Sequence, residues 1–236
     1  MADDFGTDYA HNQLLAQLSA RDLALLQPNL AYVDLPLRKP LEFRNRRIEY
    51  AYFLTRGLAS VIAYGAADRN VEVGMIGREG VTAIPLLMAT DRSPNKTFMQ
   101  GAGEGWRISA SKLTDAIDES HTLRNTLLHY AHAFMVQAAY SALANGRNKM
   151  EERMARWLLM AHDRTESEDL TLTHEFLSLM LGVRRPGVTL ALNLLERQGV
   201  ISLRRGVITI VDRKGLEKVS KGAYGVPESE YRRLFS

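Results

Sequence analysis

Residues 172–211 hold the pattern that most constrains the fold of this chain, namely two short helices around a tight turn followed by a small hairpin. Thr173 is suited to cap the first helix, because its hydroxyl can accept a hydrogen bond from an amide of the first turn. Gly182 is expected to end that helix, since glycine adopts a left-handed conformation at little cost. The second helix is expected to begin near Arg185, with Pro186 in its first turn. The stretch therefore predicts a helix-turn-helix.

The hairpin is indicated by two β-branched runs that are joined through residues 204–206. A helix-turn-helix followed by a hairpin with a basic tip is typical of winged-helix DNA-binding domains. The placement of charge favours this interpretation. Arg184 and Arg185 begin the second helix, where base edges are contacted, and Arg204 and Arg205 lie at the hairpin tip, where phosphates would lie. The alternative is that these charges merely form a solvated face.

The same stretch, THEFLSLMLGVRRPGVTLALNLLERQGVI with the hairpin after it, resembles the bacterial cyclic-AMP-receptor/FNR (Crp/Fnr) family of transcription regulators. The resemblance extends more weakly over almost the whole chain. It implies an α+β fold with an N-terminal antiparallel β-roll of the cyclic-nucleotide-binding type at 1–120, a dimerisation helix and hinge at 121–146, and a winged helix-turn-helix at 147–236. It also implies a homodimer that binds double-stranded DNA, with RNA polymerase as a candidate further partner.

Aligned on the turn at 181–183, the base-reading positions of the family fall on Arg185, Pro186 and Leu190. Arg185 suits a bidentate contact with guanine. Pro186 offers no acceptor where many relatives carry a glutamate, and Leu190 offers only apolar contact, so the resemblance implies an altered half-site. Thr189 is placed to contact a phosphate or a base. The DNA-contacting residues expected from the sequence are Thr173, Arg184, Arg185, Pro186, Thr189, Leu190, Arg204 and Arg205.

Between residues 30 and 108 the chain changes to short β runs punctuated by proline and glycine. Many short strands at near-regular spacing indicate an antiparallel barrel or sandwich. Residues 79–89 predict a short helix between strands, and residues 109–116 predict another after the last strand. Before the strands, residues 14–26 suggest one or two short helices, with Ser19 as the cap of the second.

Residues 121–145 form the longest helical stretch. Alternating spacings of four and three, the pattern of a coiled-coil seam, relate Leu127, Ala131, Phe134, Ala138, Ser141 and Asn145. We interpret this seam as a dimer interface, because helix-turn-helix proteins usually bind two half-sites as two-fold dimers. The alternative is an ordinary buried helix of one subunit. Residues 145–148 predict the end of this helix, and residues 149–163 predict the first helix of the DNA-binding domain.

Family β-rolls that bind cyclic nucleotides use Gly-Glu for the ribose and Arg-Ser or Arg-Thr for the phosphate, because a buried phosphate needs a fixed cationic fork. Here Glu79 and Gly80 occupy the glutamate position. The arginine position falls on Asn95 and the hydroxyl position on Lys96, while Arg92 lies three residues early. The resemblance therefore implies a degenerate or altered effector site with these five candidate residues. The effector is unknown, and cyclic AMP is not expected to bind.

Composition excludes several other chemistries. With no cysteine, the chain has neither disulfides nor thiolate-bound zinc or iron–sulfur clusters. His129 and His132 are three residues apart on the long helix, but no third ligand stands beside them, which favours a surface role. The sequence has no phosphate loop, nucleophile elbow or HExxH motif. We therefore expect no enzymatic activity, no cofactor and no metal.

The formal charge of +3 over 236 residues gives no general polycation character, so DNA binding must come from local clusters. No stretch reaches about 18 apolar residues, and the start at Met1–Asp4 is acidic rather than a signal peptide. We expect a cytoplasmic protein with no membrane partner. An alternative function is a small-molecule module of the cyclic-nucleotide-binding type whose winged helix makes protein contacts only.

Overall fold

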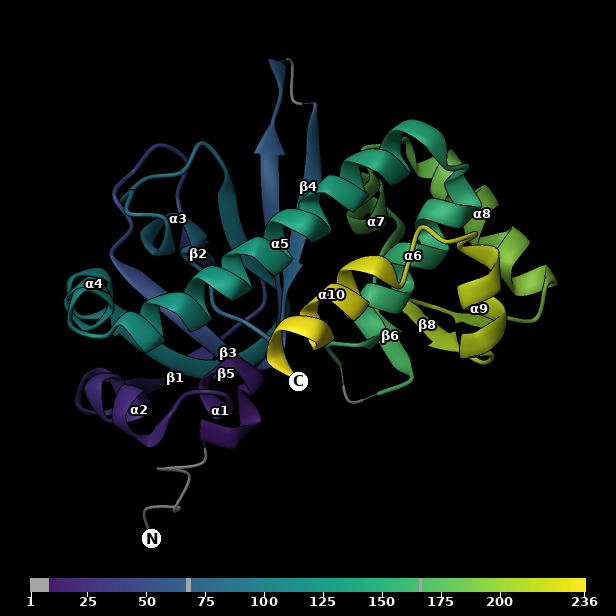
Figure 1. The fold of residues 1–236 in the computed structure, drawn as a ribbon. Coiled ribbons are helices and arrows are strands. Elements are labelled where there is room, and N and C mark those ends of the chain that lie inside the picture. The colour runs from purple at the N-terminus through teal and green to yellow at the C-terminus, as the bar shows by residue number, and fades with distance from the viewer. Residues whose placement is uncertain (1–8, 67–68, 166) are drawn as a thin grey trace, which may run out of the picture. The chain divides into compact units, whose positions relative to one another are not determined.

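The computed structural model describes residues 9–66, 69–165 and 167–236 (Figure 1), so the acidic start at 1–4 lies outside the described residues. The chain forms two compact units. The first comprises Met1–Val61, Ile76–His132 and Phe235, and the second comprises Ile62–Met75, Ala133–Leu234 and Ser236. The domain limits expected from the sequence stay a prediction, because these units are defined by compactness alone.

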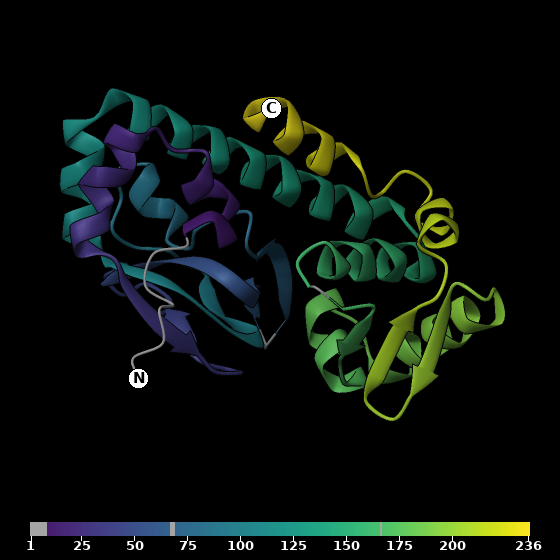
Figure 2. The same ribbon diagram turned by 90° about the horizontal axis from the view of Figure 1, so that it is seen from below.

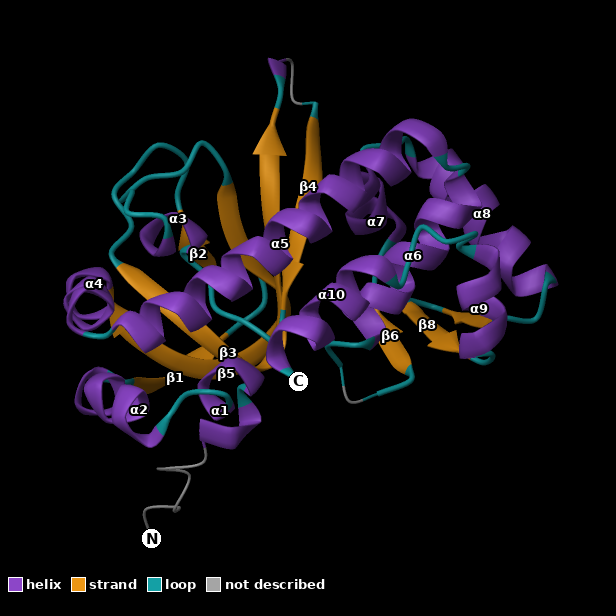
Figure 3. Ribbon diagram, viewed as in Figure 1, coloured by secondary structure: helices purple, strands orange, loops and turns teal. Residues whose placement is uncertain are grey.

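A five-stranded sheet is the centre of the first half of the chain. Its strands are β1 (Ala31–Leu35), β2 (Pro40–Glu42), β3 (Tyr50–Tyr64), β4 (Asn70–Ile76) and β5 (Lys96–Ser109). The order is β1-β5-β3-β4, with β2 also paired to β5, and both β1 and β2 run antiparallel to β5. Figure 3 shows these strands in orange. The antiparallel sheet indicated by the short β runs and the β-roll implied by the resemblance are confirmed.

Two strands are longer than the β runs in the sequence suggest. Strand β3 joins the runs at 48–54 and 59–64, and β5 joins those at 97–101 and 106–108. Gly57 allows the join in β3. Its φ is +84°, and a Cβ there would come within 3.0 Å of Ala102 and Gly103 on β5. Glycine adopts positive φ without steric cost and lets two backbones approach closely. The strand therefore passes through Gly57 without ending.

Short helices complete the first unit. They are α1 (Gln13–Ala16), α2 (Ala20–Leu26), α3 (Ile84–Leu87) and α4 (Ala110–Glu119), with 3-10 turns at Tyr9–His11 and Gln27–Asn29. Ser19 caps α2 as predicted, because its hydroxyl accepts from the amide of Asp22 at 3.1 Å. Helix α3 is a single turn rather than the longer helix predicted at 79–89. The residue before it, Ala83, has a φ of +61°, which interrupts a right-handed helix.

Helix α5 (His121–Arg147) is the predicted long helix. It runs two residues further than expected, through Asn145 and Gly146 to Arg147. Both residues are exposed at the end of the helix, where glycine costs only about 1 kcal/mol relative to alanine. Asn148 and Lys149 alone separate α5 from α6 (Met150–His162).

The second unit also contains β6 (Asp169–Thr171), α7 (His174–Leu181), α8 (Arg185–Arg197), β7 (Ile201–Arg204), β8 (Val207–Ile210), α9 (Arg213–Val219) and all of α10 (Val226–Phe235) except Phe235. Helices α7 and α8 and the hairpin confirm the predicted winged helix-turn-helix. Strand β6, which makes the sheet three-stranded in the order β6-β8-β7, was not predicted, and neither were α9 and α10. Figure 2 shows the hairpin strands as neighbouring yellow-green arrows joined by a tight turn. Fully buried core residues of this unit include Met154, Leu158, Leu177, Val188, Leu192 and Leu195.

The second half of α5 is attached to the edge strand β4 by a side-chain amide. Gln137 accepts a hydrogen bond from the amide of Met75 at 2.6 Å and donates one to the carbonyl of Met75 at 3.1 Å. The Gln137 side chain therefore takes the place of a neighbouring strand at Met75. Without it, the backbone N–H and C=O of this edge residue would be unpaired. Phe134 lies beside it, with its ring where a Cβ at Gly74 would stand.

Candidate nucleic-acid interface

The turn between α7 and α8 is set by Gly182, whose φ is +61°. The amide of Val183 donates to the carbonyl of Ser178 at 3.0 Å, and this bond closes the C-terminal end of α7. At the other end, the Thr173 hydroxyl accepts from the amide of Phe176 at 3.2 Å. Thr173 thus caps α7 as predicted. Its contact with DNA stays a prediction.

Helix α8 has a buried face and an exposed face. Val188, Ala191, Leu192 and Leu195 are buried, which fixes the rotation of the helix about its axis. The opposite face carries the expected readers Arg184, Arg185, Pro186, Thr189 and Leu190, and all five are exposed. Leu190 is 62% exposed, the joint highest value among the large hydrophobic residues described. The structure therefore presents the expected readers together on one surface.

A contact that sequence reasoning missed joins the two helices at this surface. The Nδ1 atom of His174, the first residue of α7, lies 3.0 Å from the Thr189 hydroxyl. That hydroxyl also donates to the carbonyl of Arg185 at 3.2 Å. Thr189 is therefore already held by the protein. The spacing of 15 residues between His174 and Thr189 gave no sequence signal for this pair.

The wing has a two-residue turn. Arg204 pairs with Val207, so the turn consists of Arg205 and Gly206, and Gly206 has a φ of +76°. Arg204 and Arg205 are both exposed, as predicted. Glu196 of α8 fixes the wing to the reading helix, because its carboxylate accepts from the amide of Leu203 at 2.9 Å. Sequence reasoning missed Glu196 as well, since it lies in an ordinary amphipathic helix pattern.

Helix α6 is hydrogen-bonded to the end of α7 and to α5. Arg153 donates to the carbonyl of Leu181 at the end of α7. Arg156 is buried and donates to the carbonyls of Ala223 and Gln137 and to the hydroxyl of Ser141. Burial lowers the pKa of the Arg156 guanidinium. These bonds connect α6 to α5 and to the segment before α10.

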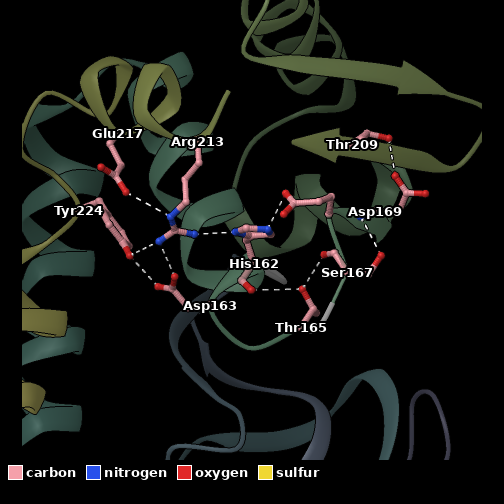
Figure 4. A network of polar contacts seen from close by, with 10 residues as sticks. His162, Asp163, Thr165, Ser167, Asp169, Thr209, Arg213, Glu217 and Tyr224 are labelled. Atoms are coloured by element: carbon pink, nitrogen blue, oxygen red, sulfur yellow. Dashed lines mark hydrogen bonds and ion pairs between the residues drawn. The ribbon is translucent and has the colours of Figure 1, made fainter. Parts of the chain in front are cut away.

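Arg213 is the centre of a polar network between α6 and α9 (Figure 4). Its guanidinium donates to Asp163 at 2.6 Å, to the Tyr224 hydroxyl at 2.7 Å and to Nδ1 of His162 at 2.6 Å. Because arginine has only donors, Nδ1 of His162 must accept, and Nε2 carries the proton toward Glu168 at 2.8 Å. The network therefore joins the end of α6 to the start of α9.

The charges in this network are strongly coupled. Burial lowers the pKa of the Arg213 guanidinium, but the charge and hydrogen bond of Asp163, together with Tyr224 and Glu217, outweigh that effect, so the pKa is raised overall. Burial, followed by the Asp163 charge, raises the pKa of the Tyr224 hydroxyl. In the same region Thr209 of β8 donates to Asp169 of β6 at 2.5 Å. These contacts fix strand β8 to β6 and the start of α9 to the end of α6.

The expected effector residues have two different sets of neighbours. The Glu79 carboxylate accepts from the amide of Gly77 at 3.1 Å, and the carbonyl of Gly80 accepts from the Asn12 side chain at 2.9 Å. A Cβ at Gly80 would overlap the ring and hydroxyl of the buried Tyr130. The side chain of Tyr130 thus fills the space directly over Gly80.

The other three candidates lie on the loop before β5 and at its first residue. Arg92 lies 3.5 Å from Asp91. The amide of Asn95 donates to the Ser93 hydroxyl at 3.0 Å, and the Lys96 ammonium lies 5.7 Å from the centre of the Phe98 ring. Each of the three therefore has local partners, and their role in binding an effector stays a prediction.

Glu42 of β2 is a buried carboxyl group that sequence reasoning missed. It accepts from the amide of Ala83 at 2.9 Å and interacts with the Thr97 side chain. Burial raises the pKa of Glu42, although these hydrogen bonds oppose the shift. The amide directly before α3 is therefore already satisfied by the protein itself. The signal in the sequence was a lone acid in an otherwise apolar strand.

Most of the dimer seam expected on α5 is covered by the chain itself, and its role as an interface stays a prediction. Leu127, Ala131 and Ser141 are buried within the chain, and Phe134 and Ala138 are partly buried. A second stripe with spacings of four and three lies one residue further on. Its members are all exposed: His121, Asn125, Leu128, His132, Met135, Ala139 and Ala142. Apart from the exposed Asn145, the first stripe faces the protein's own interior, and the second faces outward.

Two further properties concern the described part of the chain. Its histidine, aspartate and glutamate side chains form no group of three that could hold a metal ion. None of its helices is both long and apolar enough to cross a membrane.

Residues 152–219 match the family of Crp-like helix-turn-helix domains. No curated protein matches the chain. A protein from Eubacterium rectale assigned to the Crp/Fnr family of transcriptional regulators is similar in structure, with a TM-score of 0.71 and 18% identity over 90% of this chain and 100% of that one. FixK2 of Bradyrhizobium japonicum has a TM-score of 0.70 and 17% identity over 80% and 96% of the two chains.

The c-di-GMP-responsive regulator CLP of Xanthomonas campestris is also similar, with a TM-score of 0.61 and 18% identity over 81% of this chain and 99% of that one. At these identities the likeness concerns the fold. The chain therefore carries a Crp-like helix-turn-helix domain and has the fold of Crp/Fnr transcription regulators. The resemblance seen in the sequence is confirmed.

Proposed function

We propose that this protein is a DNA-binding transcription regulator that binds a two-fold operator as a homodimer. The observation that carries the proposal is the outward face of α8. An apolar side chain, Leu190, is 62% exposed among Arg185, Pro186 and Thr189, within a Crp-like helix-turn-helix domain. In a major groove Leu190 has a partner in a thymine methyl group, and Arg185 has one in guanine.

The dimer of this proposal uses the exposed stripe of α5. An apolar seam with spacings of three and four is what two parallel helices need to pack. Leu128 and Met135 supply its large apolar side chains, and Ala139 and Ala142 supply small ones that let the helices approach. Two copies of the reading helix then meet half-sites about one helical turn apart.

We infer that the sensor half has an altered effector site. Three observations support this part of the proposal. Tyr130 fills the space over Gly80, and the Glu42 carboxylate already accepts from the amide of Ala83 before α3. Asn95 stands where the family resemblance places the phosphate-binding arginine. Cyclic AMP is therefore not the expected effector.

A filter-binding or gel-shift assay at 50 and 200 mM salt tests the function. A regulator that contacts six to ten phosphates should lose about 10³–10⁵ in affinity between these concentrations. If the winged helix makes protein contacts only, duplex DNA should not bind at either concentration. A genome-wide footprint then gives the half-site, which should contain a guanine opposite Arg185.

A further inference from the structure

The hydroxyl of Thr189, on the exposed face of the reading helix α8, has two partners within the protein. It donates a hydrogen bond to the carbonyl of Arg185, one turn earlier in the same helix, at 3.2 Å. Its oxygen lies 3.0 Å from Nδ1 of His174, the first residue of α7. All three residues belong to the second unit of the chain, so the arrangement depends on that unit alone.

These two contacts fix the direction of each hydrogen bond that the hydroxyl makes. A threonine hydroxyl has one hydrogen to donate and two lone pairs with which to accept. A carbonyl oxygen has no hydrogen, so the contact with Arg185 uses the single hydroxyl hydrogen of Thr189. Nδ1 of His174 must therefore supply the hydrogen in its own contact with Thr189, as it does in one neutral tautomer and in the charged form of the ring.

Thr189 thus keeps one free lone pair and no free hydrogen. An unconstrained threonine hydroxyl contacts either kind of base edge, because it can turn to donate or to accept. The bond to Arg185 alone restrains it weakly, since 3.2 Å is long for an O–H···O bond, whose usual length is about 2.7–2.8 Å. The bond from His174 supplies the second restraint, because it holds a lone pair that would have to move if the hydroxyl turned.

A group that only accepts can distinguish the base edges of the major groove. The N6 amino group of adenine and the N4 amino group of cytosine donate, whereas N7 and O6 of guanine and O4 of thymine accept. The oxygens of an ionised phosphate also accept only. The free lone pair of Thr189 therefore fits an amino group of adenine or cytosine, and it fits neither guanine, thymine nor a phosphate.

We propose that His174 is a positioning residue that makes Thr189 an acceptor-only reader of an adenine or cytosine amino group. This inference rests on the proposed function, which places the exposed face of α8 in a major groove. It selects a base, rather than a phosphate, as the partner of Thr189. The half-site should then contain adenine or cytosine at a defined position on one strand, in addition to the guanine expected opposite Arg185.

The test measures binding of the full-length protein to the footprinted operator and to its single-base variants, with all four bases at each half-site position. Thr189→Val replaces the hydroxyl by a methyl group and so identifies the position that Thr189 reads. His174→Leu removes the Nδ1 donor, with His174→Ala as a second variant should the first not fold, and His174→Asn keeps an amide donor close to the place of Nδ1. Asn193→Ala, at an exposed position one turn after Thr189 on α8, is the control. Fluorescence anisotropy gives each affinity, and thermal unfolding shows which variants are folded.

The wild type should prefer adenine or cytosine over guanine and thymine at one position by about 5- to 150-fold, the usual cost of one mismatched base pair. Thr189→Val should lose that preference and keep the one for guanine opposite Arg185. His174→Leu should reduce it to below about 5-fold, because the released hydroxyl can turn to donate to guanine or thymine. His174→Asn and the Asn193→Ala control should keep the wild-type preference.

Base analogues test the atom that is read. Purine lacks only the N6 amino group of adenine, and 2-pyrimidinone lacks only the N4 amino group of cytosine. At the identified position the analogue should weaken binding of the wild type by about 2- to 12-fold, the usual effect of one hydrogen bond. It should leave the affinity of Thr189→Val unchanged. Equal losses for both proteins would show that another side chain contacts the amino group and would overturn the inference.

Three further results would also overturn it. If Thr189→Val changes no base preference, Thr189 reads no base, and a uniform loss with a smaller salt slope would make it a phosphate contact. If the preferred base is guanine or thymine, the hydroxyl donates. If a folded His174→Leu or His174→Ala variant keeps the full preference, His174 does not position Thr189. These results leave the proposed function standing, whereas a wild type that binds no duplex DNA would overturn both.

Discussion

The indole nitrogen of Trp157 donates a hydrogen bond to the carboxylate of Glu72 at 2.8 Å, and both side chains are buried. Trp157 lies on α6, which supports the helix-turn-helix, and Glu72 lies on the edge strand β4. One residue earlier on β4, Val71 is in van der Waals contact with the position of a Cβ at Gly182, in the turn before the reading helix. Strand β4 is thus part of the structure that holds the reading helices.

Replacing Glu72 by alanine should lower the free energy of unfolding by about 1–3 kcal/mol, because the Trp157 indole would be buried without its acceptor. Glu72→Gln keeps a carbonyl acceptor and should cost less. Urea unfolding followed by tryptophan fluorescence measures both variants. An unchanged midpoint for Glu72→Ala would show that the hydrogen bond contributes nothing.

The winged helix-turn-helix could be predicted from the sequence because its signals are local. Thr173, Gly182 and Pro186 each act on backbone groups within a few residues, so their effects do not depend on the rest of the fold. The buried role of Glu42 could not be predicted, since its partner Ala83 lies 41 residues away. The same holds for Glu72 and Trp157, which are 85 residues apart.

The dimer seam shows a different limit of the sequence. Any helix with apolar residues on two sides contains two stripes with spacings of four and three, offset by one residue. On α5 one stripe contains Phe134 and the other Met135, and both read as coiled-coil seams. The burial of Leu127 and Ala131 and the contact of the Phe134 ring with Gly74 show which stripe faces inward.

Arg185 and Arg205 should affect DNA binding in different ways. Arg185→Ala should cost about 1–3 kcal/mol at the true operator and relax the preference at one base. Arg205→Ala, at the tip of the wing, should weaken all sequences alike and reduce the salt slope by about 1. Binding titrations on operator and random duplexes measure both. Equal losses on both duplexes for Arg185→Ala would make Arg185 a phosphate contact instead.

Calorimetry with cyclic AMP should show weak binding or none, because Asn95 replaces the expected arginine and Tyr130 fills the space over Gly80. The control is Glu79→Ala, which should change nothing if no cyclic-AMP site exists. Micromolar binding to the wild type that this variant abolishes would restore a cyclic-nucleotide site. Arg92 would then be the first residue to test as the phosphate ligand.

The buried Glu42 should make stability depend on pH. Its pKa in the folded state is raised above the ordinary value of 4.5, so its contribution is present below that value and is lost as pH rises through the raised pKa. Glu42→Gln removes this titration and keeps an acceptor for the amide of Ala83. The Tm of the variant relative to the wild type should therefore be higher at pH 8 than at pH 4. Glu49→Gln, at an exposed position, is the control, and an equal Tm difference at both pH values would contradict the assignment.

A charged substitution should have different effects in the two stripes of α5, namely loss of the dimer in the exposed stripe and loss of folding stability in the buried one. Met135 is 58% exposed, so Met135→Asp should leave the monomer folded and place a charge in the dimer seam, where an unpaired buried charge costs several kcal/mol. Phe134→Asp instead removes the ring that packs on Gly74 and should destabilise the fold, by about 3–5 kcal/mol if it costs as much as a large-to-small core substitution. Sedimentation measures the oligomeric state, and thermal unfolding measures the stability of the fold.

A folded monomer for Met135→Asp, where the wild type is a dimer, supports the exposed stripe as the interface. A stable, folded monomer for Phe134→Asp with an intact Met135→Asp dimer would return the interface to the first stripe.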